Sequence, residues 1–353
     1  MNLQFPYLTS EMTQEIFKSN ETLSLESGES LPGFQLSYTT IGQLNEAKDN
    51  VVWVLHALTG DANPHEWWSG LIGEDKFFDP NRHFIVCANM LGSCYGSTQP
   101  LDENPRTGEP YYYDFPTLTT RDLANTLELL RQNLGISQIN TVIGGSLGGQ
   151  VALEWAFTLG DKLKNAIIVA SNAKASPWII AFNEAQRMAI EADQTWGEKH
   201  PNAGKRGLET ARAIGMISYR HPKTFILRQG ETEEKTDNFK ISSYLRYQGL
   251  KLANRFNAFS YYKLSKAMDS HDVGRSRGGT EVALQHIKAR VLAIGVDSDV
   301  LFTADESQFI AHHVPKGTYR EINSIYGHDA FLIEYEQLNY ILKGFYLESN
   351  FAS

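Results

Sequence analysis

Short, continuous apolar runs recur along the chain and predict strands whose two faces are both covered. These runs span Val51–Leu55, Phe84–Ala88, Ile139–Ile143, Ala166–Ala170 and Arg290–Val296, and Thr318–Ile322 is a further candidate strand. Apolar residues at helical spacing predict helices over Thr120–Leu134, Leu147–Leu159, Phe309–His313 and Tyr335–Phe345. Strands that alternate with helices in this order form a mostly parallel sheet with helices on both faces.

An antiparallel pair is predicted ahead of the first buried run. Thr22–Glu26 and Gln35–Thr39 lie on either side of turn signals at Gly28 and at Pro32 and Gly33. Such residues between two extended segments are typical of a hairpin connection. We therefore expect this pair at an edge of the sheet.

The alternation of strands and helices stops between residues 176 and 285. Helical patterns occupy Trp178–Asp193, Gly207–Tyr219, Ser242–Leu252 and Tyr261–Met268, and the polar stretch Arg228–Lys240 is typical of a solvated loop. No run here predicts a buried strand. We expect an α/β core formed by residues 1–175 and 286–353, with residues 176–285 inserted as a helical cap.

Composition narrows the possible partners. The chain has 353 residues, 42% hydrophobic and 21% charged, with a net charge of −9, so nothing favours nucleic acid or an anionic membrane surface as a partner. Its two cysteines, Cys87 and Cys94, cannot form a disulfide framework, and no metal-ligand spacing is present. The N-terminal stretch lacks the pattern of a secretory signal, and no apolar run approaches the ~18 residues of a membrane span. We expect a cytoplasmic protein without metal.

The most informative stretch is TVIGGSLGG, residues 141–149, which contains the pattern G-x-S-x-G around Ser146. A predicted strand leads into it and a predicted helix leads out, as in a nucleophile elbow, where a tight turn lifts the serine hydroxyl above the sheet. The same pattern also occurs in glycine-rich turns that only pack a helix or hold a phosphate. Because the strand–turn–helix context is present, we interpret Ser146 as a nucleophile.

A serine nucleophile needs a base, which is in turn oriented by a carboxylate. In enzymes with such an elbow the acid and then the histidine follow the serine along the chain. Asp297 and Asp299 follow the predicted strand Arg290–Val296, and His328 lies in a later loop, so His328 is the predicted base. Spacing alone leaves Asp297 and Asp299 as alternatives for the acid.

Backbone N–H groups should stabilise the oxyanion. One donor is expected from Leu147, directly after the nucleophile, and the other from Leu58 or Thr59, in the loop after Val51–Leu55. We interpret His56 as a residue that organises this loop through hydrogen bonds rather than as a second base.

A series of motifs runs between His56 and Glu334, namely HALTGDA, WWSGLIG, FIVCANMLGSCYGST, RDLANTLELL, VIGGSLGGQVALEWA, IAFNEAQRMAI, SYLRYQG, IGVDSDVLF and YGHDAFLIE. In this order they resemble the homoserine O-acetyltransferases of methionine biosynthesis, which have the α/β-hydrolase fold. The elbow and triad motifs are shared across the hydrolase fold, whereas FNE, SYLRYQG and YGHDAFL are particular to this family. Leu147 departs from the family, in which methionine is common after the serine, but this leaves the backbone N–H unchanged.

The resemblance implies roles for further residues. It assigns the triad carboxylate to Asp299, and we take Leu58 and Leu147 as the oxyanion donors. It also implies that Arg212, Tyr219 and Asp329 bind the amino-acid substrate, and we expect Thr59 to contribute to the same site. Because 219 − 212 = 7 residues is two helical turns, Arg212 and Tyr219 can face one pocket. A guanidinium suits the carboxylate of homoserine, and Asp329 suits its ammonium group.

The expected reaction is transfer of acetyl from acetyl-CoA to the γ-hydroxyl of L-homoserine through an acyl-serine, with no permanently bound cofactor. Alternatives on the same scaffold are homoserine O-succinyltransferase, serine O-acyltransferase and a capped esterase. The family resemblance also implies a homodimer formed through the cap helices. Aromatic residues make up 11% of the chain. Those in or near the cap are expected to line a dry tunnel and a cap–cap interface, and they are Trp67, Trp68, Trp178, Phe182, Tyr219, Tyr244, Tyr247, Tyr261 and Tyr262.

Overall fold

A computed structural model describes residues 12–350 of the chain, so residues 1–11 of the N-terminal stretch considered above lie outside the described part. Eight strands form one sheet in the order β1-β2-β4-β3-β7-β8-β9-β10. The strands are β1 (Met12–Ser24), β2 (Ser30–Ile41), β3 (Val51–Leu55), β4 (Phe84–Ala88), β7 (Ile139–Gly145), β8 (Leu163–Val169), β9 (Arg290–Val296) and β10 (Gly317–Ile322). The pairs β1–β2 and β2–β4 are antiparallel and all others are parallel, which confirms the predicted mostly parallel sheet.

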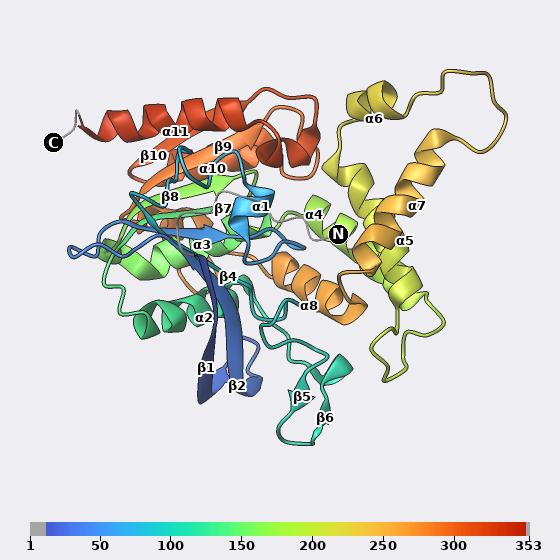
Figure 1. Cartoon of the computed structure of the whole chain (residues 1–353), viewed down its shortest axis with the longest axis horizontal. Helices are drawn as coiled ribbons and strands as arrows, with labels where there is room; N and C mark the ends of the chain where they lie inside the picture. The colour runs from blue at the N-terminus through green and yellow to red at the C-terminus, as the bar shows by residue number, and fades with distance from the viewer. Residues whose placement is uncertain (1–11, 351–353) are drawn as a thin grey trace.

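Helices cover both faces of this sheet (Figure 1). They include α1 (Pro64–Trp67), α2 (Thr120–Asn133), α3 (Leu147–Leu159), α10 (Ala304–His313) and α11 (Tyr335–Asn350). The remaining short elements are β5 (Glu103–Asn104), β6 (Glu109–Pro110), η1 (Tyr112–Asp114), η2 (Gly160–Lys162) and η3 (Gly327–Leu332), and β5 and β6 form a small separate hairpin.

Alternate residues of the central strands explain why the apolar runs were continuous. On β3, Trp53 faces the layer of α2 and α3, where its ring meets Trp155 edge-on at 4.9 Å between centroids. Val52 and Val54 face the opposite layer, which contains α11. Both faces of the strand are therefore buried, and every position along it is apolar.

The N-terminal hairpin differs in one respect from the prediction. β1 and β2 pair as expected, and the turn between them contains Gly28, at φ +87°. The second predicted turn, at Pro32 and Gly33, is wrong because both residues lie inside β2. The pairing register shifts between Ser19 and Thr22 of β1, and this irregularity accommodates the proline and glycine without ending the strand.

Residues 176–285 contain only helices as regular elements. These are α4 (Pro177–Glu191), α5 (Lys205–Tyr219), α6 (Pro222–Gln229), α7 (Lys240–Ala253), α8 (Ala258–Asp269) and α9 (Thr280–Gln285). Figure 1 shows α5, α6 and α7 extending to one side of the sheet, whereas α8 lies closer to it. Neither α6 nor α9 was predicted from the sequence.

Burial divides the aromatic residues expected to line a tunnel. Trp68 is completely buried in the core, where its indole N–H donates to the carbonyl of Phe331 at 2.9 Å. Tyr261 is also buried, whereas Trp178 on α4 and Tyr247 on α7 are exposed. The tunnel itself stays a prediction. Over residues 12–350, no helix is long and apolar enough to cross a membrane.

Candidate active site

Ser146 occupies a strained turn between β7 and α3. Its backbone has φ +57° and ψ −125°, in a region that residues other than glycine rarely adopt. The turn is anchored on both sides, because the Ser146 N–H donates to the carbonyl of Val169 at 3.0 Å and the Ser171 hydroxyl donates to the Ser146 carbonyl at 2.9 Å. A Cβ on Gly144 would lie 2.3 Å from the carbonyl oxygen of Gly148, so the turn requires glycine there.

His328 and Asp299 form a buried pair, and Phe331, whose ring meets that of His328, packs against Gly145 in this turn. The His328 Nδ1–H donates to Asp299 Oδ2 at 2.6 Å. The other carboxylate oxygen, Oδ1, accepts the backbone N–H groups of Leu301 and Phe302 at 2.8 and 3.0 Å. Asp297, the alternative left open by spacing, instead accepts the N–H of Ser324 at 2.9 Å. Of the two aspartates, only Asp299 contacts the histidine.

Aromatic rings enclose the imidazole of His328. Phe302 stacks on it at 5.1 Å between centroids and 23° between planes, and Phe331 meets it edge-on at 5.5 Å. The ring centroid of Tyr219, on α5, lies 5.9 Å from that of His328. The second imidazole nitrogen, Nε2, is buried and makes no hydrogen bond with a described residue. It is therefore available to a substrate or to the serine, whose bond to such a base is often long before substrate binds.

Burial and the neighbouring carboxylates have opposite effects on the pKa of His328. Burial lowers its pKa, but the carboxylate of Asp299, by charge and by hydrogen bond, and the charge of Asp329 outweigh this and leave the pKa raised above the ordinary value of 6.5. Opposite charges close to an imidazole stabilise its protonated form. The site is therefore suited to holding the imidazolium that forms when His328 takes a proton.

The loop after β3 reaches the same region. The backbone N–H groups of Leu58 and Leu147 donate to no described residue, and Leu147 is the first residue of α3. Free N–H groups at a helix start are available to an anion. Arg255, from the segment between α7 and α8, donates to the Thr59 carbonyl at 2.8 Å and fixes this loop from the cap side.

His56 organises the same loop, as predicted from the sequence. Its Nε2 accepts the N–H of Met90 at 2.9 Å, and its Nδ1 lies 2.8 Å from the carbonyl oxygen of Ala57. Burial lowers its pKa below the ordinary value, so the ring is neutral and acts as a structural acceptor.

Arg212 and Tyr219 lie together on α5, as their spacing predicted. The guanidinium carbon of Arg212 is 5.2 Å from the Tyr219 ring centroid. Arg212 is only partly exposed and forms no ion pair or hydrogen bond with a described residue. A guanidinium of this kind, next to the ring that contacts His328, is free to bind an incoming carboxylate.

Asp329 already has a partner that the sequence analysis did not identify. Arg220 Nε donates to Asp329 Oδ2 at 2.7 Å, and both side chains are partly buried. Arg220 could have been suspected from the sequence, because it directly follows Tyr219, a predicted binding residue. Phe302 follows Asp299 by three residues, whereas nothing in the sequence connects Arg255 with the loop at Thr59.

These residues together can carry out nucleophilic acyl chemistry: a strained serine, a buried His–Asp pair, free N–H donors and an unpaired guanidinium converge at the end of the sheet. Within the described residues, no group of three or more His, Cys, Asp or Glu side chains lies close enough to hold a metal ion.

Comparison with known proteins agrees with this chemistry. The family described as the alpha/beta hydrolase fold matches residues 50–335. The chain is 77% identical over 350 residues to a homoserine O-acetyltransferase of Cyclobacterium marinum, covering 99% of this chain and 100% of the relative.

Solved structures share the whole architecture. A homoserine O-acetyltransferase from Bacillus anthracis superposes with a TM-score of 0.87 at 23% identity, covering 94% of this chain and 97% of the other. An acetylester hydrolase from Corynebacterium glutamicum superposes with a TM-score of 0.80 at 25% identity, covering 91% and 90%. Transferases and hydrolases therefore share this fold, so the fold alone does not distinguish between them.

Proposed function

The chain belongs to the homoserine O-acetyltransferase family, and from that premise we propose how its residues divide the reaction among them. As a member of this family it is an acyltransferase on the α/β-hydrolase scaffold that acetylates homoserine for methionine biosynthesis. The observation that supports the assignment of residues is the 2.6 Å bond between His328 and Asp299, beside the strained turn at Ser146. Acetyl-CoA is the co-substrate, and no cofactor stays bound.

In the first half-reaction, His328 Nε2 takes the proton of Ser146 Oγ as that oxygen attacks the thioester carbon. The N–H groups of Leu147 and of the loop at Leu58 stabilise the oxyanion. The carbon–sulfur bond then breaks, and the imidazolium protonates the departing thiolate, which leaves as free CoA. Asp299 holds Nδ1 as the donor and stabilises the charged ring. The product is acetyl-Ser146.

In the second half-reaction, the γ-hydroxyl of homoserine replaces the thiol. His328 takes its proton while the hydroxyl oxygen attacks the acetyl carbon. The bond to Ser146 then breaks, and the imidazolium returns a proton to Oγ. The products are O-acetylhomoserine and free Ser146, so the enzyme is ready for a second acetyl-CoA.

The amino-acid acceptor is bound from the cap side. Arg212 binds its carboxylate, and Tyr219 and Thr59 complete the pocket. Asp329 receives the ammonium group through Oδ1, because Arg220 already engages Oδ2. We expect this pocket to favour homoserine over serine, whose hydroxyl is one methylene closer to the charged groups and would stop short of the acyl carbon.

The cap formed by residues 176–285 has two further proposed roles. It excludes water from acetyl-Ser146, which would otherwise be hydrolysed. It also forms a homodimer, because Ile226 and Leu227 on α6 are 72% and 69% exposed and Tyr247 on α7 is 59% exposed. Sedimentation of a Leu227→Glu variant tests the dimer. If α6 forms the interface, this variant should be a folded monomer. We place the protein in the cytoplasm, in keeping with its two free cysteines.

Intact-mass spectrometry after mixing with acetyl-CoA tests the mechanism. The native protein should gain one acetyl group, whereas Ser146→Ala should gain none and lose transferase activity. Ser27→Ala, at an exposed turn, is the matched control and should behave as the native protein. A Ser146→Ala variant with near-native transfer would overturn the assignment.

Substrate crossing tests the alternatives. Rates with acetyl-CoA and succinyl-CoA, each combined with homoserine and serine, should be highest for acetyl-CoA with homoserine. Dominant activity with succinyl-CoA or with serine would replace the substrate assignment. The acetylester hydrolase among the structural neighbours makes hydrolysis the second candidate, and rapid release of CoA without any amino acid would favour it.

A further inference from the structure

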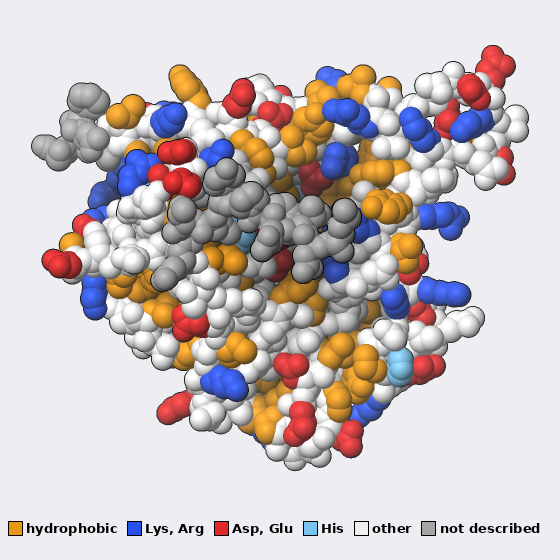
Figure 2. Space-filling view, in the orientation of Figure 1, with side chains coloured by type: hydrophobic (Ala, Val, Ile, Leu, Met, Phe, Trp, Pro, Cys, Tyr) orange, Lys and Arg blue, Asp and Glu red, His pale blue; other side chains and the backbone are white. Residues whose placement is uncertain are grey.

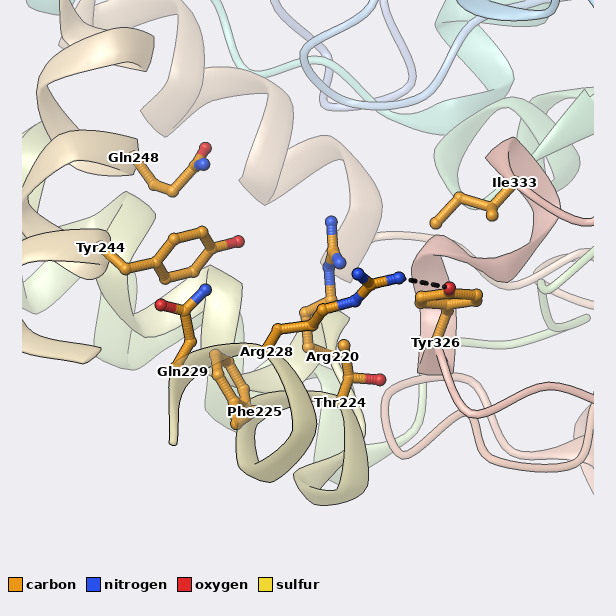
Figure 3. A pocket seen from close by; sticks show the side chains of 9 residues that line it. All are labelled: Arg220, Thr224, Phe225, Arg228, Gln229, Tyr244, Gln248, Tyr326 and Ile333. Atoms are coloured by element: carbon orange, nitrogen blue, oxygen red, sulfur yellow. Dashed lines mark hydrogen bonds between the residues drawn. The ribbon is translucent and has the colours of Figure 1, made fainter. Parts of the chain in front are cut away.

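A cavity of about 450 Å³ lies between the cap and η3, and Arg220, the partner of Asp329, is one of the residues that line it. Arg228 and Gln229 of α6, together with Phe225, line one side, and Tyr244 of α7 faces them across the cavity (Figure 3). Tyr326, directly before η3, closes the core side. In Figure 2 the surface is hollowed between the cap and the core, and Lys and Arg side chains lie there beside hydrophobic ones.

The cavity is positively charged. Two guanidinium groups, of Arg220 and Arg228, line it, and no carboxylate does so among the described residues. Arg228 donates only to the Tyr326 hydroxyl, at 3.3 Å, and makes no ion pair with a described residue. Arg220 uses Nε for Asp329, whereas its two terminal nitrogens make no bond to a described residue. Several guanidinium N–H groups therefore remain unpaired, and these are the donors that bind phosphate in forked geometry.

Aromatic rings stand beside these donors. Phe225 and Tyr244 meet at 6.4 Å between centroids with 76° between their planes, and both face the cavity. A ring face in a positively charged cavity suits a ligand that combines a planar base with phosphates. A free phosphate would bind the arginines but would make no contact that requires the two aromatic rings.

The cavity lies on the outer side of the turn that carries the predicted base. Tyr326 and Ile333 flank η3, which contains His328, and Arg220 contacts Asp329 next to the base. A ligand in the cavity would therefore lie close to the segment that carries the predicted base. An acyl-CoA could occupy the cavity and the reaction centre together, because a long flexible arm separates its thioester from its nucleotide phosphates.

We infer that this cavity binds the phosphorylated nucleotide end of the acyl-CoA donor, with Arg228 and Arg220 on the phosphates and Tyr244 against the adenine. The inference rests on the proposed function, since it names where that donor binds. The protein has a net charge of −9, so its surface on average repels an anionic donor. Binding such a donor therefore requires a local group of positive side chains.

The test compares two donors that differ only in the nucleotide. Arg228→Gln should raise the KM for acetyl-CoA by about tenfold, the loss expected for one charge-assisted hydrogen bond, with little change in kcat. The same variant should leave kcat/KM for acetyl-pantetheine, which has no phosphates, unchanged. Arg228→Lys keeps the charge but loses the forked geometry. Its KM for acetyl-CoA should therefore lie between those of the native protein and Arg228→Gln.

Arg206→Gln is the matched control. It removes the same charge from an exposed position near the start of α5, about 20 Å along the helix from its end at Tyr219. It should leave both donors unaffected. An equal change for both donors in Arg228→Gln, or no change for either, would overturn the inference.

Calorimetric titration with adenosine 3′,5′-bisphosphate separates the cavity from the reaction, because it measures binding without transfer. Native protein should bind it, and Arg228→Gln should bind it about tenfold more weakly. If the native protein transferred acetyl from neither donor, the proposed function would fail, and the titration would still decide whether the cavity binds the nucleotide. Equal binding by the native protein and Arg228→Gln would overturn the inference even in an active enzyme.

Discussion

Replacing Asp299 with asparagine would reverse the hydrogen bond that orients the proposed base. Two backbone N–H groups, of Leu301 and Phe302, point at Oδ1, and His328 Nδ1–H points at Oδ2. In Asp299→Asn the two N–H groups hold the amide oxygen on their side, so the NH2 faces His328. Because NH2 is a donor, Nδ1 must accept, and the ring proton moves to Nε2. That nitrogen can then no longer take the proton of Ser146.

The expected loss is large. A histidine held in the wrong tautomer is expected to lower kcat by about 10⁴-fold. At 1.36 kcal/mol for each factor of ten, this corresponds to about 5.4 kcal/mol of lost transition-state stabilisation. Release of free thiol from acetyl-CoA at saturating homoserine measures kcat, and intact mass shows whether acetyl-Ser146 still forms. Asp297→Asn is the matched control, because Asp297 bonds the Ser324 N–H and not the histidine.

The pH dependence provides a second, independent readout. Burial lowers the pKa of His328, and Asp299 is the main group that raises it again. In the native enzyme, activity should therefore fall as the pH falls through a pKa above 6.5, where the base becomes protonated. In Asp299→Asn this acid limb should move to lower pH. A kcat within about tenfold of native, or greater damage from Asp297→Asn, would refute the reasoning.

Three further predictions concern Gly148, Arg220 and His271. Gly148→Ala would place a Cβ 2.2 Å from a backbone oxygen and should lower the free energy of unfolding by about 3 kcal/mol or more, whereas Gly344→Ala, with nothing within 4 Å, should raise it by about 0.5–1 kcal/mol in urea titrations. Arg220→Met removes the partner of a carboxylate beside His328, so the pKa of His328 should rise further and the acid limb of kcat/KM should move to higher pH. Burial lowers the pKa of His271 to about 3, so the unfolded chain binds its proton first and stability falls as the pH drops from 6.5 towards 3. His271→Gln should flatten that slope by up to about 1.4 kcal/mol per pH unit.

Each of these has a clear contrary outcome. Equal stability of the two glycine variants would contradict the backbone contact at Gly148. An acid limb that stays in place in Arg220→Met would show that the ion pair does not affect the base. For His271, an unchanged slope between pH 6.5 and 3 in equilibrium unfolding would mean that the ring is protonated in the folded protein.

The core strands were predictable because their burial is encoded locally. Val51–Leu55 and Arg290–Val296 are apolar at nearly every position and were located to the residue. Helix α6 was missed for the opposite reason: Ile226 and Leu227 are exposed, so its sequence shows no buried face. The turn predicted at Pro32 and Gly33 failed because pairing with β1 overrides the local signal.

The candidate site was predictable where chain order carries the information. Ser146 and His328 follow from an elbow pattern and from a histidine after a late strand, and their roles stay predictions that the variants above test. The distinction between Asp297 and Asp299 could not be drawn from spacing, because it depends on which carboxylate the fold turns towards the imidazole. Arg255 could not be found either, since its contact with the Thr59 carbonyl joins segments 196 residues apart.

The closeness of Gly148 to β3 has a consequence for how this scaffold diverges. A Cβ there would meet the Leu55 carbonyl oxygen at 2.2 Å and the His56 carbonyl oxygen at 3.0 Å, so the start of α3 rests directly on the end of β3. The spacing between Ser146 and the loop at Leu58 is therefore set by main chain against main chain, with no side chain between them. Mutations that reshape the acceptor pocket can accumulate without moving the reacting groups. Proteins of this fold can in this way differ in the acyl acceptor, water or an amino acid, while the contact between α3 and β3 stays the same.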